Sequence, residues 1–367
     1  MKKRIAVVLF NLGGPDKAES IRPFLFNFFM DKNIIRLPLP LRFMIATLIA
    51  NKRSKNEAGS SYGFLGGGSP LLENTQAQAD ALQGVLAQRD DADYSVFVCM
   101  RYWHPMAEDV VRKVAAWNPD RIVLLPLYPQ YSTTTTRSSL QEWNRFATQA
   151  KLDAPTSLVC CYPEARGFVN TSADNVRKAY EEALTVTQGK DLPMPRVLFS
   201  AHGLPEDVIT DGDPYQAQCE QSARAIARAT GIEGLDWTIC YQSRVGPKKW
   251  IGPSTSDEIK RAALDKTPLV VYPHAFVNEH VETLVEIEIE YRHEADALGV
   301  PYFARVPTVS TDGGFIEDLA GLVVSHARQS GIQPAAGVRV CPLSSKRCCM
   351  SECSVITGGL QNEYAVA

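Results

Sequence analysis

Two short stretches of the chain carry side chains that suit metal binding and proton transfer. The first is His202, which follows an apolar run at residues 196–200 and precedes Gly203 and Pro205. An imidazole titrates near neutral pH, and its ring nitrogens bind borderline divalent metals. A lone histidine in such a place is more often a structural residue, so His202 becomes informative only together with a partner.

The second stretch holds three carboxylates four residues apart, Glu282, Glu286 and Glu290, shortly after His280. In a regular α-helix such residues drift by about 40° per step, and a π-type widening would align them more closely. A solvated acidic face is the simpler interpretation of the charge run. However, the positions between the carboxylates are apolar, which indicates a largely buried helix whose carboxylates bind cations or exchange protons.

His202 and Glu282 together would bring one imidazole and one carboxylate to a common cavity. Such a pair suits transient binding of a divalent metal together with proton acceptance, whereas a tight structural site would require four ligands. Aromatic and amphipathic side chains elsewhere predict that the ligand is large, flat and apolar. They are Tyr62, Arg101, Tyr102, Trp103, His104, Tyr128, Tyr131, Trp250 and Phe276.

The elements that must position these residues follow an alternating pattern. Short runs of apolar and β-branched residues alternate with amphipathic stretches of helical length, which predicts an α/β class with doubly wound parallel sheets. In such sheets ligands bind beyond the carboxyl ends of the strands, where His202 lies. The predicted strands are residues 5–10, 95–100, 121–125, 157–161, 196–200, 237–241 and 268–272, and the predicted helices are residues 106–117, 138–150, 169–184, 215–229 and 280–298.

The number of elements suits two Rossmann-like halves, with the crossover near residues 162–167. The first half is predicted to span residues 1–163 and to be completed by a helix at residues 311–330. The second half, residues 164–310, carries both candidate catalytic residues. A cysteine-rich extension at residues 331–367 follows.

Length, charge and cysteine usage limit the class of protein. The 367 residues are 45% hydrophobic and 22% charged, which excludes a disordered or fibrous chain, and the net charge of -3 argues against a nucleic-acid partner. No apolar run reaches the roughly 20 residues that cross a membrane. Nine cysteines without a signal peptide argue against a secreted disulfide framework, so we expect a soluble, cytoplasmic protein.

One segment, residues 24–45, breaks the alternation because it is dense in large apolar side chains. Its helices either pack on the sheet as core or form an exposed lip that accepts an apolar ligand or contacts a membrane surface. Lys52, Arg53 and Lys55 follow directly and are candidates for pairing with anionic groups. The lip interpretation predicts peripheral membrane contact through this segment.

The ordered motifs of the chain strongly resemble those of the ferrochelatase family, which inserts ferrous iron into protoporphyrin in the terminal step of haem synthesis. The segment from residue 198 to Tyr215 is the most specific. The resemblance implies a lyase with two Rossmann-like halves and a porphyrin cleft between them. It also implies a distorted macrocycle that accepts iron and releases two protons. The motifs are residues 9–15, 66–70, 101–105, 128–132, 198–205, 242–247, 250–253 and 276–282.

The resemblance also implies roles for single residues. His202 and Glu282 match the pair that handles metal and protons, with His202 as proton acceptor and Glu282 assisting, and it stays open which of them delivers iron. Glu286 and Glu290 match an acidic path for metal or proton traffic. The positions that match the lining or support of the porphyrin pocket are Leu12, Tyr62, Ser69, Arg101, Tyr102, Trp250, Phe276 and His280.

The cysteine-rich tail resembles the extension of family members that carry a [2Fe-2S] cluster, which takes four thiolates. Threonines stand within residues 131–134, where one branch of the family supplies a ligand. A zinc site or thiols without a metal are the alternatives. The expected ligands are Cys161, Cys341, Cys348 and Cys353, with Cys160 and Cys349 as substitutes.

Three other functions fit parts of the pattern. A coproporphyrin-specific chelatase would favour a more basic pocket, whereas the apolar residues 24–45 favour protoporphyrin. A non-catalytic porphyrin or metal carrier has no use for a proton-accepting pair, and an iron–sulfur redox sensor would leave the signature around His202 without a purpose. The expected ligands are therefore protoporphyrin IX and ferrous iron, and we expect a monomer or a homodimer.

Overall fold

The computed structural model describes residues 2–59, 61–89 and 92–351, and the chain divides into two compact units. The first unit comprises Met1–Tyr162, Ile316–Val340 and the chain from Lys346 onward. The second unit comprises Pro163–Phe315 and Cys341–Ser345. Each unit is built on one parallel sheet, which confirms the predicted α/β class with two parallel-sheet domains.

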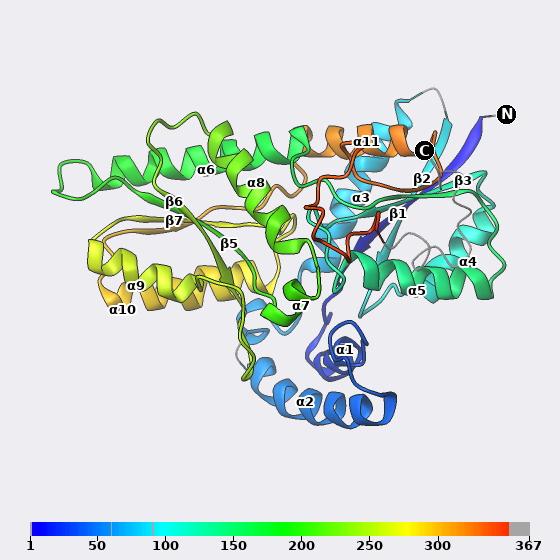
Figure 1. Cartoon of the computed structure of the whole chain (residues 1–367), viewed down its shortest axis with the longest axis horizontal. Coiled ribbons are helices and arrows are strands. Elements are labelled where there is room, and N and C mark those ends of the chain that lie inside the picture. The colour runs from blue at the N-terminus through cyan, green and yellow to red at the C-terminus, as the bar shows by residue number, and fades with distance from the viewer. Residues whose placement is uncertain (1, 60, 90–91, 352–367) are drawn as a thin grey trace. The chain divides into compact units, whose positions relative to one another are not determined.

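The sheet of the first unit has the strand order β2-β1-β3-β4-β9. Its central strands are almost wholly apolar and buried, as expected for parallel strands covered on both faces. The strands are β1 (Lys3–Asn11), β2 (Ala92–Met100), β3 (Arg121–Pro126), β4 (Thr156–Val159) and β9 (Gly331–Gln333). Figure 1 shows α3 (Leu71–Ala87) and α11 (Gly313–His326) on one face and α4 (Ala107–Trp117) and α5 (Thr136–Gln149) on the other.

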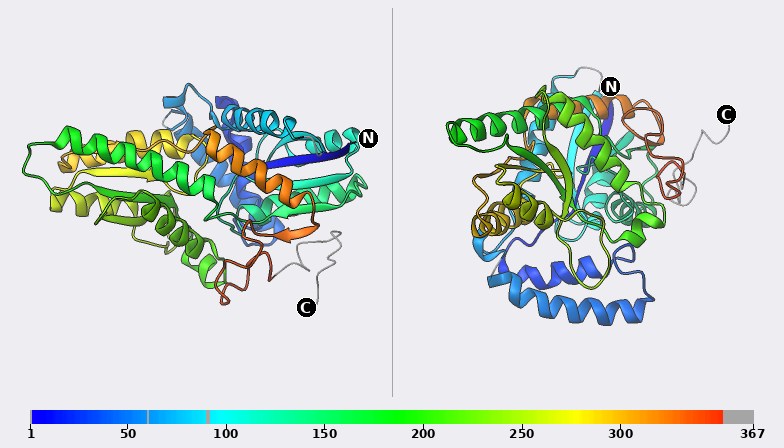
Figure 2. Two further views of the ribbon diagram at one scale, coloured as in Figure 1. Left: turned by 90° about the horizontal axis from the view of Figure 1, so that it is seen from above. Right: turned by 60° about the vertical axis from the view of Figure 1, so that its left-hand side comes forward.

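Helices α1 (Ala18–Phe29) and α2 (Leu39–Gly59) of the first unit run side by side (Figure 2). A short 3-10 turn, η1 (Gly63–Leu65), follows them in the chain. The predicted apolar segment is therefore divided between two environments. The α1 part is core, since Phe24 and Leu25 are buried, whereas α2 leaves its large apolar side chains exposed. Within the described part of the chain, no helix combines the length and apolarity needed to span a membrane.

The sheet of the second unit has the strand order β6-β5-β7-β8. Its strands are β5 (Arg196–His202), β6 (Trp237–Gln242), β7 (Leu269–Pro273) and β8 (Phe303–Arg305). Figure 1 shows α6 (Arg166–Thr187) and α8 (Tyr215–Ala229) above this sheet and α9 (Thr255–Asp265) and α10 (Arg292–Leu298) below it, while the short α7 (Glu206–Thr210) follows β5.

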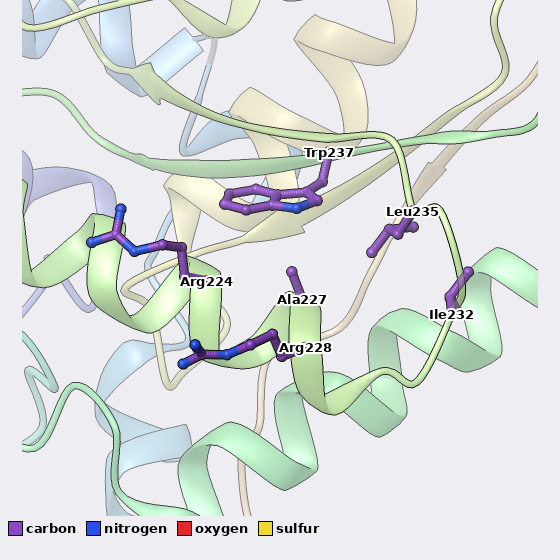
Figure 3. A pocket seen from close by; sticks show the side chains of 6 residues that line it. All are labelled: Arg224, Ala227, Arg228, Ile232, Leu235 and Trp237. Atoms are coloured by element: carbon purple, nitrogen blue, oxygen red, sulfur yellow. The ribbon is translucent and has the colours of Figure 1, made fainter.

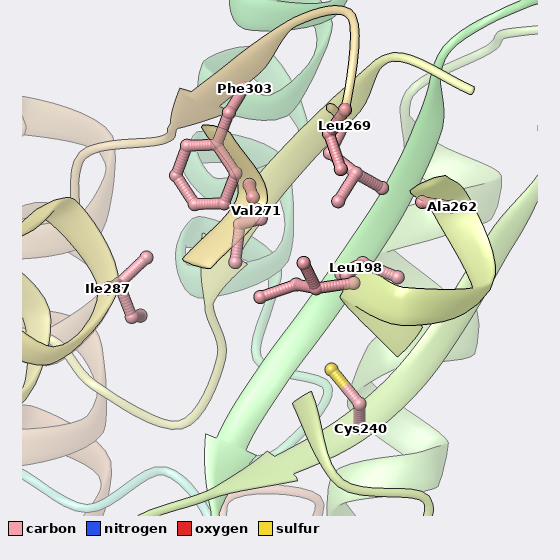
Figure 4. Packing of buried hydrophobic residues seen from close by; sticks show 10 residues of the cluster. Leu198, Cys240, Ala262, Leu269, Val271, Ile287 and Phe303 are labelled. Atoms are coloured by element: carbon pink, nitrogen blue, oxygen red, sulfur yellow. The ribbon is translucent and has the colours of Figure 1, made fainter. Parts of the chain in front are cut away.

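The segment with the three spaced carboxylates is a ten-residue π-helix, η2 (Glu282–Tyr291), that continues into α10. The predicted helix at residues 280–298 therefore exists in two parts, and the first has the π-type widening. Ile287 of η2 packs in one buried cluster with Leu198 of β5 and Val271 of β7 (Figure 4). This packing fixes the π-helix to the sheet whose strand ends at His202.

Candidate active site

His202 is the last residue of β5, and Gly203 allows the chain to pass close to β6. The Gly203 N–H donates to the Gln242 carbonyl oxygen at 2.9 Å. A Cβ atom on Gly203 would lie only 2.8 Å from that oxygen and 3.2 Å from the Trp250 ring. The glycine after the histidine is therefore required by the close approach of two strand ends and an indole.

The His202 imidazole presents an unprotonated nitrogen in its neutral form. Its Nδ1 atom lies 2.6 Å from the Gly203 carbonyl oxygen. Because a carbonyl oxygen only accepts, Nδ1 carries the hydrogen and the lone pair is left on Nε2. The side chain is 35% exposed, so a ligand can reach that lone pair.

The Glu282 carboxylate faces a histidine with each of its oxygens. Oε1 lies 3.5 Å from Nε2 of His202, and Oε2 lies 3.3 Å from Nε2 of His280. His280 is buried, and its Nδ1 atom has no hydrogen-bond partner among the described residues. A proton on the His280 ring is therefore favoured on Nε2, where Glu282 accepts it.

The His202–Glu282 contact joins two acceptors when the imidazole is neutral. A proton or a divalent cation placed between Nε2 and Oε1 would interact with both. Across the described residues, no group of three or more His, Cys, Asp or Glu side chains is arranged to hold a metal ion. The His202–Glu282 pair itself offers two ligand atoms, fewer than the four of a structural metal site.

The other π-helix carboxylates have different surroundings. Glu286 accepts hydrogen bonds from Gln242, Ser243 and Tyr291. Glu288, which the spacing argument did not include, forms ion pairs with two arginines. Partial burial and the neighbouring Glu286 carboxylate raise the pKa of Glu290 above its usual value.

His274, which the sequence analysis did not single out, is a buried structural histidine beside the site. Its Nε2 atom lies 2.9 Å from both the Ser222 hydroxyl and the Cys219 carbonyl oxygen. Burial lowers its pKa to about 4, so the ring is neutral at physiological pH. His274 and His202 are both histidines, so residue type alone does not tell them apart. The depth of burial does, since His274 is buried and His202 is partly exposed.

Two predicted porphyrin-contacting residues of the second unit are partly exposed near His202 and His280. Trp250 pairs with Pro205 through an isolated β-bridge, and its indole N–H donates to the Val245 carbonyl oxygen. The Phe276 ring centroid lies 4.8 Å from that of His280. The Phe276 ring therefore packs against His280, and the Trp250 ring lies beside Gly203, the residue after His202.

The predicted porphyrin residues of the first unit form a separate group. Arg101 donates to Asp31 at 3.1 Å and to Ser138 at 2.7 Å, and the Tyr102 hydroxyl donates to the same Asp31 oxygen. Tyr102 is fully buried, so it supports Arg101 rather than exposing its own ring. Sequence reasoning missed Asp31, a single carboxylate at the end of an apolar run. Tyr62 is buried as well, and Leu12 and Ser69 are partly exposed.

The cysteines predicted as cluster ligands lie in both units. Cys160 and Cys161 follow β4 with their sulfur atoms 4.0 Å apart. Burial, together with Cys161 and Cys349, raises the pKa of Cys160. In the second unit, Gln218 donates to the Cys341 sulfur at 3.0 Å. Cys348 and Cys349 are buried in the first unit, and Cys353 lies outside the described residues.

A cavity of about 350 Å³ in the second unit lies at the other end of β6 (Figure 3). It is lined by residues of α8, the following loop and Trp237, which begins β6, whereas Gln242 ends that strand beside His202. Ligands of parallel sheets bind at the carboxyl ends of the strands. The cavity is therefore not the site formed around His202.

Comparison with known proteins gives one consistent family. A family model described as ferrochelatase matches residues 4–327. The ferrochelatase of Phenylobacterium zucineum is 49% identical over 346 residues, which covers 94% of this chain and 97% of that protein. The ferrochelatase of Pelagibacter ubique is 44% identical, with coverage of 95% and 98%.

Solved structures give a likeness of fold. The structure of SirB from Bacillus subtilis with Fe3+ has a TM-score of 0.50 and 11% sequence identity, and the match covers 89% of this chain and 96% of SirB. At this identity the likeness concerns the arrangement of elements alone.

Proposed function

The chain belongs to the ferrochelatase family of metal chelatases, lyases that insert iron into a porphyrin in haem biosynthesis, and we propose that His202 and Glu282 perform this step on ferrous iron and protoporphyrin IX. The single observation that supports their role is the 3.5 Å contact between Nε2 of His202 and Oε1 of Glu282 at the carboxyl end of β5. One partner is a base with a free lone pair, and the other is a carboxylate held by a second histidine.

His202 and Glu282 together provide the proton acceptor that the reaction needs. Two pyrrole N–H bonds break as the nitrogens bind Fe²⁺, and two protons leave the macrocycle. A proton acceptor must lie within hydrogen-bond reach of the reacting group. His202 takes the two protons in turn on Nε2 and passes each to solvent, and the nearby Glu282 carboxylate stabilises the imidazolium that forms each time.

The same two side chains suit the metal. Ferrous iron accepts imidazole nitrogen and carboxylate oxygen ligands. Two protein ligands bind it less tightly than the four of a structural site. A donor set of this size favours transfer of iron into the porphyrin over storage by the protein.

Porphyrin contacts are part of the proposal. Trp250 and Phe276 offer aromatic surface beside the histidines, and Arg101 offers a positive charge in the first unit. Lys52 and Arg53 are proposed to pair with the propionate groups. Leu12 and Ser69 complete the contacts, while Tyr62 and Tyr102 support them from buried positions.

The direct test of the substrate is an anaerobic metalation assay with purified protein. Protoporphyrin IX and ferrous iron should give the absorption spectrum of protohaem at a rate that depends on protein concentration. Metalation of coproporphyrin alone would keep the reaction class and replace the substrate. Porphyrin binding without metalation would instead support a carrier.

A [2Fe-2S] cluster held by the C-terminal cysteines is a further proposal. All eight described cysteines are buried, and Cys160, Cys161, Cys348 and Cys349 all belong to the first unit. Their thiols are the donor type that such a cluster requires, and bound thiolates would cross-link the tail to the body of the protein. The contact between the Cys160 and Cys349 side chains supports a ligand from the Cys160–Cys161 pair.

The cluster proposal is tested by iron and sulfide analysis and by visible absorption of anaerobically purified protein. Cys348→Ser should remove the absorption, whereas Cys99→Ser, a buried thiol in β2, should keep it. Absorption that survives Cys348→Ser, or zinc in place of iron, would contradict the proposal.

Membrane contact through α2 is proposed from its surface. Leu39, Leu41, Phe43, Met44 and Leu48 are all exposed on this helix. Lys52 and Lys55 continue the same helix with exposed positive charges. Apolar side chains next to basic ones favour binding to anionic lipid surfaces. Nine cysteines scattered through the chain suit a reducing compartment, and we propose the cytoplasm.

A further inference from the structure

We infer that Gln242 and Glu286 are positioning residues that set the separation of His202 and Glu282, an inference that rests on the proposed function of that pair. Gln242 ends β6 directly beside His202 in the parallel register. Its main-chain carbonyl accepts the Gly203 N–H at 2.9 Å. The strand end that carries His202 is thus attached to the backbone of Gln242.

The Gln242 side chain makes the connection to Glu282. Its Nε2 atom donates to the Glu282 carbonyl oxygen at 3.0 Å and to Oε2 of Glu286 at 2.9 Å. Both partners only accept, so the amide orientation is fixed by chemistry. One residue therefore links the β5 strand end to the first residue of the π-helix.

Ser200 holds the opposite side of the same amide. Its hydroxyl donates to Oε1 of Gln242 at 2.8 Å, two residues before His202 on β5. Gln242 is almost completely buried, and this contact uses its oxygen while the π-helix uses its nitrogen. A buried amide satisfied on both sides has little freedom to shift.

Glu286 holds Gln242 and is itself fully occupied. Oε1 accepts from the Ser243 N–H at 2.7 Å and from the Tyr291 hydroxyl at 3.0 Å. Oε2 accepts from the Ser243 hydroxyl at 2.6 Å and from Gln242. A carboxylate has about four lone-pair directions, and here four neutral donors use them. Glu286 would have to release protein donors before it could bind a cation.

Ser243 shows that this carboxylate holds the backbone as well. Ser243 has a φ of 62°, the left-handed region that a serine seldom adopts. Its N–H and its hydroxyl both donate to Glu286, which offsets the cost of that conformation. Glu286 therefore fixes the turn after β6. Of the two carboxylates predicted to carry metal or proton traffic, only Glu290 is left for that role.

The test is a double-substitution comparison of single-turnover iron insertion. Gln242→Met keeps the length of the side chain and removes its polar contacts. It should lower the insertion rate by about tenfold or more and leave the porphyrin KM within about twofold, because misplacement of reacting groups affects the chemical step. In a Glu282→Gln background, the same substitution should cost less than about twofold, because the group that it positions is already impaired.

Gln78→Met is the matched control, since Gln78 of α3 is an equally buried amide in the first unit. It should lower thermal stability without a change in insertion rate. If Gln242→Met fails to fold, Ser243→Ala takes its place and should lower the rate by about threefold. An equal loss of insertion rate in both backgrounds, or a Gln242→Met protein with the wild-type rate, would overturn the inference and leave the proposed function intact. A wild-type protein that binds protoporphyrin without metalating it would overturn the proposed function and the inference together.

Discussion

The Oε2 atom of Glu282 lies 3.3 Å from Nε2 of His280, so the carboxylate that faces His202 is held at its other oxygen by a second imidazole. His280 is buried whereas His202 is exposed to ligand. The two histidines that contact this one carboxylate thus differ in burial and are expected to have different roles. We propose that His280 orients Glu282 and that His202 contacts the substrate.

Replacing His280 should reveal this orienting role. His280→Leu removes the donor to Glu282 and should lower kcat for iron insertion by about tenfold or more. His280→Gln, whose amide can still donate, should recover part of that loss. Steady-state kinetics with both variants makes the comparison, and equal rates for Leu and Gln would contradict the role. His326→Leu, a buried histidine of α11, is the control for general destabilisation.

His274 should give the protein a pH-dependent stability. Its pKa is about 4 in the folded protein against 6.5 in an exposed imidazole, so the unfolded chain binds the proton more readily. The stabilisation is complete above pH 6.5 and is lost as the pH falls toward 4. Between pH 7 and pH 5 the free energy of unfolding should fall by about 2 kcal/mol from this residue. Denaturant titrations of wild type and His274→Gln measure it, and an identical pH slope would contradict it.

Lys52 and Arg53 should contribute to porphyrin binding. Their joint replacement by alanine removes two positive charges from the C-terminal half of α2 and should raise the porphyrin KM about threefold or more, with little change in kcat. Lys260→Ala on the exposed face of α9 is the control. An unchanged KM for protoporphyrin would remove the proposed propionate contacts.

The exposed face of α2 should bind lipid. Leu41, Met44 and Leu48 share one helix face, and burying each apolar side chain fully contributes about 1.5–3 kcal/mol. Replacing all three by serine should weaken flotation with vesicles that contain phosphatidylglycerol by more than about tenfold. Leu264→Ser is the matched control, because Leu264 is 86% exposed on α9. Equal flotation of both variants would contradict membrane contact through α2.

The fold could be predicted where the sequence pattern is local. Continuous apolar runs indicated seven strands, and all seven are present because parallel strands are buried on both faces. β8 and β9 were missed, since three residues are too few to show a pattern. The four-residue spacing of Glu282, Glu286 and Glu290 had suggested a π-type widening, and the structure has a π-helix there.

The candidate site could be predicted only in part, because the hydrogen-bond partners of its side chains come from distant segments of the chain. The four-residue spacing made Glu282, Glu286 and Glu290 look equivalent. In the structure, however, Gln242 and Ser243 at the end of β6 donate hydrogen bonds to Glu286. Likewise, the sequence predicted Tyr102 as a residue that lines or supports the porphyrin pocket, but it gave no sign that Asp31, 71 positions earlier, accepts a hydrogen bond from its hydroxyl in a buried place. Burial and long-range hydrogen bonds decide which of several similar residues is free to act.

The most direct test of the account is the rate of anaerobic iron insertion into protoporphyrin IX by His202→Ala beside the wild type. The account predicts a loss of about 100-fold or more in kcat with porphyrin binding retained, because the base that accepts the pyrrole proton is gone. His293→Ala, an exposed histidine of α10, should keep the wild-type rate. A His202→Ala protein that metalates protoporphyrin as fast as the wild type would contradict the central claim.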